Sequence, residues 1–409
     1  MHATHMVPAL RCACSNQSTA RALACEELFS RAPHAALADA YERKLLNGVL
    51  GINHPKHPGR MVYMMPLGAG VSKAKANNAG FGDPEDAFWC CYGTGIESFA
   101  KLAEGAFYEP VDGGSALDST IVDSQLAGEM GGGGVKGGSG GGSSGSQAGQ
   151  HGAHAPPTLV VSQFIPSTLR WAAGGVQLQL RRELEAKTCA ALVVELSLGR
   201  LLPDPEAEKA NEGSVGGGSV GGGSVGDGGA ERGCFTPAGC TLWLRIPSWA
   251  DKHASSVTLR TPSRGAASAA VIEPPAASSS SASSSSTEMR VGRFLRVHRT
   301  WAVGDALAAR FGLYAYLEPL NDWRPQYEST FALLYGPKML VGLTQTAEHT
   351  IRGSPADVRR WTNVTHCGAA GWTSVRLSAP NAASDAGRLE LMALSAVVEQ
   401  TYSAFFRVA

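Results

Sequence analysis

Residues 88–99 read Phe-Trp-Cys-Cys-Tyr-Gly-Thr-Gly-Ile-Glu-Ser-Phe, which joins two adjacent cysteines to the start of a predicted helix. Thr94 and Glu97 have the spacing of a capping box, and apolar residues recur at helical spacing after them. We therefore expect Cys90 and Cys91 to lie in a glycine-rich turn just before a helix N-terminus. At that position, unpaired N–H groups and the helix dipole stabilise a thiolate.

The adjacent cysteines themselves indicate a particular chemistry. A disulfide between neighbours in the chain is geometrically unfavourable, so soft metal ligation or thiolate chemistry is one interpretation of the pair. The other is packing, because reduced cysteine is among the most buried residue types. A zinc site would need two further ligands from Cys, His, Asp or Glu.

Several blocks of the chain resemble segments of one enzyme family and follow one another in the same order as in that family. The residues around the cysteine pair and those from Met61 to Ala74 resemble the plant-type β-L-arabinofuranosidases of glycoside hydrolase family 127 (GH127). The remaining blocks that carry the resemblance are residues 38–51, 163–171, 244–249, 299–305, 324–328 and 334–342. These seven blocks in order, with the stretch from Met61 through the cysteine pair counted as one, are far more specific than a single motif.

The resemblance implies a retaining glycosidase with a cysteine nucleophile. In the family, the first cysteine of the pair attacks the anomeric carbon, and zinc is bound by both cysteines, a third cysteine and a glutamate. Cys90 would then be the nucleophile and a zinc ligand, and Cys91 a zinc ligand. Zinc deprotonates a thiol, and a retaining mechanism needs one nucleophile and one acid/base.

The other zinc ligands are harder to place in this chain. The family takes them from a Glu-x-Cys motif, whereas residues 11–17 read Arg-Cys-Ala-Cys-Ser-Asn-Gln. Cys14 falls near the position of the expected cysteine, and Cys12 stands in place of the glutamate. The resemblance thus implies Cys12 and Cys14 as candidate ligands. The alternative is that residues 1–16 are unrelated to the family.

The family's acid/base glutamate has no counterpart in this sequence. No glutamate precedes Glu26, and we interpret Glu26 and Glu27 as exposed helix residues. The resemblance therefore implies an N-terminally truncated relative that carries the last part of an (α/α) toroid followed by β-sandwich domains. Whether the chain is an active enzyme stays open. The alternatives are an inactive zinc- or glycan-binding fragment and a thiol redox or metal-binding protein.

The hydrophobic pattern changes from helical to strand periodicity along the chain. We expect an N-terminal segment without assigned structure over 1–16 and partial catalytic-domain helices over 17–112. A glycine-rich insert over 113–157 precedes a β-sandwich over 158–325, which carries low-complexity inserts at 203–233 and 262–288, and a β-rich region over 326–409. The predicted strands are 158–165, 176–180, 190–196, 240–246, 256–260, 293–298 and 306–311.

Composition limits the classes of partner. The 35 basic and 35 acidic residues leave no electrostatic footprint for nucleic acid or an anionic membrane, and no apolar run is long enough to span a bilayer. The resemblance implies a carbohydrate partner, an arabinofuranosyl glycan or glycoprotein. It also implies a secretory-pathway location for the full-length form, although no signal peptide is visible.

Two further residue sets carry predictions about structure. Cys234 and Cys240 straddle a Pro-x-Gly turn and would form a small disulfide loop in a secreted protein. Trp243, Trp249 and Trp301 are either core residues, which we favour, or a stacking platform for sugar rings. The sequence indicates nothing about the oligomeric state.

Overall fold

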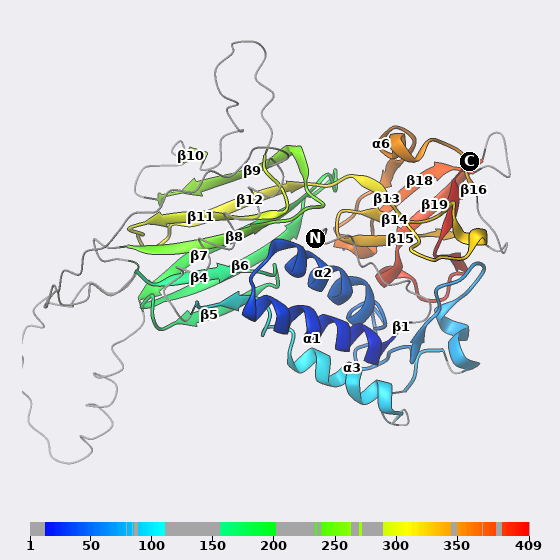
Figure 1. The fold of residues 1–409 in the computed structure, drawn as a ribbon, viewed down its shortest axis with the longest axis horizontal. Helices are drawn as coiled ribbons and strands as arrows, with labels where there is room; N and C mark the ends of the chain where they lie inside the picture. Colours follow the sequence, from blue (N-terminus) through cyan, green and yellow to red (C-terminus); the bar gives the residue numbers. More distant parts are fainter. Residues whose placement is uncertain are drawn as a thin grey trace, which may run out of the picture.

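The computed structural model combines a small helical part with three β-sheets of four or more strands (Figure 1). It describes residues 13–78, 80–83, 85, 89–110, 156–201, 234, 239–262, 270–271, 289–344, 350–369, 371–381 and 387–408. No described helix is both long and apolar enough to cross a membrane. The three predicted low-complexity stretches fall almost entirely outside these residues.

The helical part is built from α1 (Ser15–Arg31), α2 (Ala35–Lys44) and α3 (Cys90–Ala100). A π-helical turn, Leu45–Val49, continues α2, and a 3-10 helix spans Lys73–Asn78. Two short strands, β1 (Ala13–Cys14) and β2 (Met64–Met65), form an antiparallel pair. Figure 1 shows the three α-helices, in blue and cyan, beside the junction of the two β-rich parts.

Two sheets follow the helical part in sequence. The first has the order β10-β9-β12-β7-β6-β5 and the second β11-β8-β4-β3. Their bounds are β3 (Phe107–Tyr108), β4 (Thr158–Val161), β5 (Ser167–Trp171), β6 (Val176–Leu184), β7 (Ala191–Leu201), β8 (Cys240–Ile246), β9 (Asp251–Arg260), β10 (Ala270–Val271), β11 (Arg293–Arg299) and β12 (Ala306–Gly312). Each of the seven predicted strands coincides with a strand of the structure, although the one predicted over 158–165 ends at Val161. The described residues between Thr158 and Phe311 contain no α-helix.

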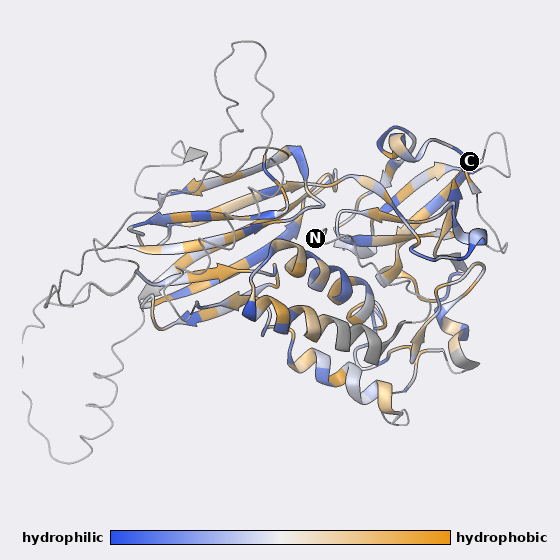
Figure 2. Ribbon diagram, viewed as in Figure 1, coloured by the Kyte–Doolittle hydropathy of each residue, from blue (hydrophilic) through white to orange (hydrophobic). Residues whose placement is uncertain are grey.

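The two sheets share one hydrophobic core because alternate side chains of each strand point toward it. Leu178 of β6 and Leu242 and Leu244 of β8 all belong to this core. Figure 2 shows the resulting alternation of orange and blue along the strands of this part. Every residue of β8 is buried, because its other face is also covered. On that face Trp243 packs with Phe29 of α1.

The third sheet is formed by the C-terminal part of the chain. Its order is β16-β21-β14-β15-β19-β18-β17, with β13 paired to β14 and β20 paired to β15. The strands are β13 (Ala315–Pro319), β14 (Thr330–Tyr335), β15 (Lys338–Leu343), β16 (Thr350–Ile351), β17 (Asn363–His366), β18 (Arg376–Pro380), β19 (Arg388–Ala393), β20 (Tyr402–Ser403) and β21 (Phe406–Val408). A short helix, α6 (Val358–Trp361), lies between β16 and β17.

Two disulfides occur among the described cysteines. Cys234–Cys240 closes the small loop that the sequence predicts. Cys189–Cys367 joins residues 178 positions apart and connects the start of β7 to the segment after β17. The second bond was not predicted, because its partners are distant in sequence and come together only through the packing of the third sheet against the first.

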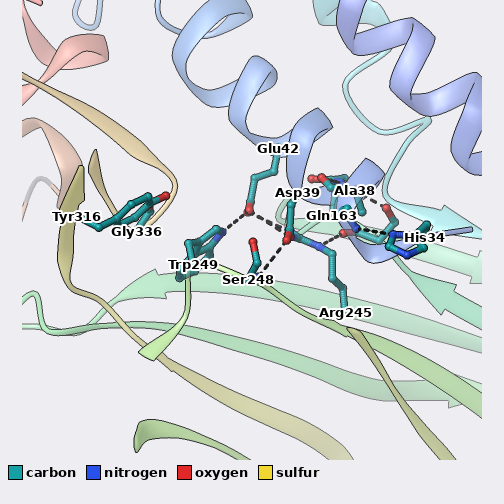
Figure 3. A network of polar contacts seen from close by, with 12 residues as sticks. His34, Ala38, Asp39, Glu42, Gln163, Arg245, Ser248, Trp249, Tyr316 and Gly336 are labelled. Atoms are coloured by element: carbon teal, nitrogen blue, oxygen red, sulfur yellow. Dashed lines mark hydrogen bonds and ion pairs between the residues drawn. The ribbon is translucent and has the colours of Figure 1, made fainter. Parts of the chain in front are cut away.

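The helical part is fixed to the first β-rich part by a buried polar network, shown in Figure 3. Arg245 of β8 is fully buried and forms ion pairs with Asp39 and Glu42, which lie one turn apart on α2. Trp249 donates its indole N–H to Glu42 Oε2 at 2.7 Å, and the Ser248 amide donates to Asp39 Oδ2 at 3.0 Å. The hydrogen bonds satisfy both carboxylates, which burial would otherwise destabilise.

Candidate functional site

The candidate site lies at the first turn of α3, which begins at Cys90 itself. The prediction that the pair precedes the helix is therefore wrong, because both cysteines belong to the first turn of α3. The predicted capping box is also absent: Trp89 occupies the N-cap position without a side-chain hydrogen bond. Thr94 donates instead to the Cys90 carbonyl at 3.3 Å, and Glu97 pairs with Lys101. Threonine commonly satisfies its hydroxyl on the carbonyl four residues earlier, so its position does not fix the helix start.

The two cysteines have different environments on this first turn. Cys90 is exposed, whereas the side chain of Cys91 is buried. Their sulfur atoms lie 3.9 Å apart, and neither is in a disulfide. The first-turn position keeps Cys90 close to the positive end of the helix dipole. The pair thus presents one accessible thiol with a second thiol behind it.

Tyr63 completes the site from a separate segment. Its hydroxyl lies 3.2 Å from Cys90 Sγ. The Tyr63 ring contacts Trp89 edge-on, with centroids 5.1 Å apart, and Tyr92 at 5.5 Å. The backbone before it is held by the Val62 amide, which donates to the Ile52 carbonyl at 2.9 Å. The hydroxyl is therefore positioned over the sulfur by its neighbours.

The hydrogen bonds to the sulfur have an electrostatic consequence. The bond from Tyr63 and then the contact with Cys91 lower the pKa of Cys90 below that of an ordinary thiol, against a small opposing effect of desolvation. The same bond raises the pKa of Tyr63, because the phenol stays protonated to donate it. A donor that stabilises the thiolate in this way increases the fraction of Cys90 present as thiolate, which is the nucleophilic form of a cysteine.

Tyr63 was not singled out by the sequence analysis. It lies within the segment Met61 to Ala74 that carries the family resemblance, but nothing local marks it as a partner of Cys90. The C-terminal sheet helps to hold this segment. Tyr402 of β20 donates its hydroxyl to the Pro66 carbonyl at 2.6 Å, and its backbone pairs with Val71. A contact between residues 27 positions apart depends on such long-range packing.

The backbone places Cys14 on the strand pair that adjoins the site. In the β1–β2 register, Cys14 lies opposite Met64, the residue after Tyr63. The side chain of Cys14 and the whole of Cys12 lie outside the described residues, so their role as ligands stays a prediction. Among the described residues, no group of three or more His, Cys, Asp or Glu side chains could hold a metal ion.

The spacing of the two sulfur atoms can be compared with zinc coordination. Two thiolates on a tetrahedral zinc, each about 2.3 Å from the metal, lie about 3.8 Å apart. The observed separation between Cys90 and Cys91 is 3.9 Å. These two residues therefore fit two corners of a zinc site.

Glu26 differs from the sequence expectation. It is half-buried rather than exposed, and burial together with nearby Glu104 raises its pKa. However, its charged neighbours Lys101 and Glu104 follow the C-terminal end of α3, whereas Cys90 begins that helix. An eleven-residue helix is about 16 Å long. Glu26 is thus too far along the helix to act on a bond at Cys90. Glu27 is exposed, as predicted, and pairs with Arg31.

The three tryptophans considered as a sugar platform are core residues. Trp243, Trp249 and Trp301 are each at most 4 % exposed. Trp301 donates its indole N–H to the Cys240 carbonyl at 3.3 Å. The core interpretation is therefore confirmed, and the platform interpretation is wrong for all three.

Comparisons with known proteins give one family match, over the N-terminal part of the chain. Residues 11–104 match the family model of the GH127 β-L-arabinofuranosidase catalytic domain. This range contains both the cysteine pair and Tyr63. No curated protein matches the sequence.

Three solved structures have a similar fold, and two of them are GH127 enzymes. One glycoside hydrolase has a TM-score of 0.56 and 13 % identity, with 97 % of this chain and 52 % of that chain covered. A GH127 β-L-arabinofuranosidase from Geobacillus stearothermophilus T6 has a TM-score of 0.53 and 13 % identity, covering 97 % and 50 %. A GH127 β-arabinofuranosidase has a TM-score of 0.55 and 12 % identity, covering 97 % and 49 %.

At such identities the structural likeness concerns the fold alone, and the chain spans about half the length of these proteins. The match to the GH127 family model rests on sequence, and it covers the segment that carries the site. The chain thus resembles the GH127 β-L-arabinofuranosidases, in sequence over residues 11–104 and in fold over nearly its whole length.

Proposed function

We propose that this chain is the nucleophile-bearing part of a retaining glycosidase that acts on terminal arabinofuranosyl linkages, with Cys90 as nucleophile. The observation that carries the proposal is the Cys90 thiol itself. It is exposed, begins a helix, and lies within hydrogen-bond distance of the Tyr63 hydroxyl, at 3.2 Å. In this proposal α1, α2 and α3 are part of an (α/α) toroid, and the two sheets that share a core are a β-sandwich.

The reaction would proceed in two displacements. The Cys90 thiolate attacks the anomeric carbon, the glycosidic C–O bond breaks, and the leaving oxygen takes a proton from a general acid. Water then attacks the same carbon, the C–S bond breaks, and the thiolate is restored with overall retention. Tyr63 stabilises the thiolate before the first step and again as it leaves in the second. We assign the general acid to no residue of this chain.

Zinc is compatible with this proposal, because the candidate ligands are cysteine thiolates, which zinc binds well. Cys90 and Cys91 would hold it, with Cys14 and Cys12 as candidates for the remaining positions. When bound, zinc would supply positive charge that keeps its cysteine ligands deprotonated. Because Cys91 is buried and Cys90 is exposed, the Cys90 sulfur is the one of the two that a substrate can reach.

The test is a chemical trap of the nucleophile. The protein is incubated with an aryl β-L-arabinofuranoside, quenched in acid and digested, and the peptide that contains residues 89–101 is weighed. We expect a mass increase of one pentosyl residue on Cys90 and none on Cys25, the half-buried thiol of α1. Cys90→Ser should abolish the adduct, because serine is not ionised at neutral pH.

The other outcomes distinguish the alternatives. Zinc bound at one equivalent without an adduct or product would identify a non-catalytic zinc-binding protein. Reversible oxidation of Cys90, measured by thiol counting, without any sugar chemistry would identify a thiol redox function. An adduct that persists in Cys90→Ser would overturn the assignment of the nucleophile.

A further inference from the structure

One aromatic side chain far from the site in the sequence is presented to solvent. Trp323 lies in the connection between β13 and β14 and is 91 % exposed, more than any other large hydrophobic side chain of the described residues. Single exposed apolar residues are ordinary on protein surfaces, but an indole is the largest of them. Its presentation therefore needs a structural reason.

The loop holds Trp323 outward through its two neighbours. Arg324 donates from Nε to Asp322 Oδ1 at 2.8 Å and from Nη2 to Asp322 Oδ2 at 2.7 Å. The Arg324 amide also donates to Asp322 Oδ1 at 3.0 Å. The backbone bends at Trp323 and Arg324, and the contacts between Asp322 and Arg324 fix this bend, from which the indole projects into solvent.

The rest of the loop is ordered by short-range contacts. The Leu320 amide donates to the Thr330 carbonyl at 2.8 Å and closes the base of the loop. The guanidinium of Arg324 also lies over the Tyr327 ring, 4.7 Å from its centroid. A rigid aromatic anchor loses little conformational entropy when it binds a ligand. The loop that carries the indole is thus held at its base and along its length.

The surroundings of Trp323 favour one class of ligand. Protein-docking surfaces present contiguous apolar patches, whereas the other exposed residues of this loop, apart from Pro325, are polar: Asn321, Gln326, Glu328 and Ser329. A flat aromatic face with hydrogen-bonding groups around it suits a sugar ring, whose C–H face packs on the ring while its hydroxyls bind the polar groups.

We propose that Trp323 is a stacking platform for a sugar unit of a polymeric glycan, on the C-terminal sheet and separate from α3, which carries Cys90. The proposal rests on the proposed function for the kind of ligand, a carbohydrate chain. In this proposal Trp323 holds the polymer and takes no part in the reaction. A small aryl glycoside, which has a single sugar, would not need it.

The test is native affinity electrophoresis of the whole chain in gels that contain soluble arabinan, with gels without polysaccharide as reference. We expect arabinan to retard the protein and Trp323→Ala to weaken the apparent binding about tenfold, as for an aromatic anchor. Trp323→Phe should retain part of the retardation. The matched control is Val303→Ala, at another exposed apolar residue of a connecting loop, which should behave like the wild type.

Each other outcome counts against the platform. No retardation by arabinan, or equal retardation of the wild type and Trp323→Ala, overturns it. A change of oligomeric state in Trp323→Ala, measured by sedimentation, without a change in retardation would show that the indole is a protein contact. The proposed function fails separately, by absence of the pentosyl adduct on Cys90, and retardation that depends on Trp323 would survive that failure.

Discussion

The hydrogen bond between Tyr63 and Cys90 makes the reactivity of a single sulfur depend on a residue 27 positions away. A thiol at a helix start is already favoured as a thiolate, but the dipole effect is modest at an exposed position. The phenol adds a directed donor at 3.2 Å. Because Tyr63 is packed between Trp89 and Tyr92, the donor is held where the sulfur needs it.

Tyr63→Phe should therefore raise the pKa of Cys90, because the thiolate loses its largest stabilising contact. The measurement is the pH dependence of alkylation of Cys90 by iodoacetamide in the presence of a chelator, followed by peptide mass spectrometry. We expect the midpoint to move to higher pH and the rate at pH 7 to fall severalfold. Alkylation of Cys25 in the same samples is the internal control. An unchanged midpoint would contradict the role of Tyr63.

Two glycines of α3 offer a matched pair of substitutions at the residue scale. A Cβ on Gly93 would meet nothing within 4 Å, whereas a Cβ on Gly95 would lie 2.6 Å from Met61 Sδ. Gly93→Ala should raise the free energy of unfolding by about 0.5–1 kcal/mol, because alanine favours the helix. Gly95→Ala gains the same preference but must displace buried Met61.

Urea unfolding of both variants checks this expectation. Gly95→Ala should be less stable than Gly93→Ala by about 1 kcal/mol or more, the order of an overpacking cost. If the two variants were equally stable, α3 would not pack as closely on Met61 as the structure shows.

At the scale of elements, α2 is attached to β8 by charge as well as by packing. Removing Arg245 leaves Asp39 and Glu42 buried without their cation. Arg245→Met should lower the free energy of unfolding by about 3–5 kcal/mol, the usual result of breaking a buried ion pair from one side. The triple variant Arg245→Met, Asp39→Asn, Glu42→Gln should recover part of the loss in urea unfolding. No recovery would mean that packing, not the unpaired charges, dominates.

The elements also show what the sequence could predict. The strands were predictable because each carries an apolar or alternating run between turn residues; β8, for example, has the predicted bounds 240–246. The start of α3 was not, because Thr94 imitates a cap while bonding inside the helix. The cysteine pair was visible in the sequence, but Tyr63 and Cys367 were not, since their partners are set by tertiary packing.

At the scale of the whole molecule, two buried lysines join the helical part to the C-terminal sheet. Lys73 donates to the carbonyls of Gly51 and Leu394, at 2.7 and 2.6 Å. Lys338 donates to the Leu46 carbonyl and to Ser395 Oγ, both at 3.2 Å. Burial is the main cause that lowers the pKa of each lysine to about 7.

These lysines predict how stability depends on pH. The unfolded chain keeps both protonated up to their ordinary pKa of 10.5, whereas the folded protein releases the protons near pH 7. The unfolded state therefore binds more protons between pH 7 and 10, and stability should rise with pH there, by at most about 1.4 kcal/mol per unit for each lysine. Above about pH 10 the rise should end, because the lysines of the unfolded chain then lose their protons as well. Stability should fall from there, because burial raises the pKa of Tyr41 and Tyr335 to about 12 and the folded state keeps protons that the unfolded state loses.

Unfolding in urea at a series of pH values measures this slope. Lys73→Met, which keeps the chain length without the charge, should flatten the slope between pH 7 and 10. Lys56→Met, at an exposed lysine, is the matched control and should leave it unchanged. A wild-type protein whose stability falls over this interval would contradict the prediction.

The bond between Cys189 and Cys367 has a practical consequence for anyone who makes the protein. Disulfides form readily in secretory compartments and rarely in a reducing cytosol, where this tie between the first and third sheets would be lost. The same oxidants reach Cys90, which faces solvent. Recombinant protein should therefore be expressed in an oxidising host, so that its disulfides form. A mild reductant should then return Cys90 to the thiol form before assay, while the buried disulfides stay intact.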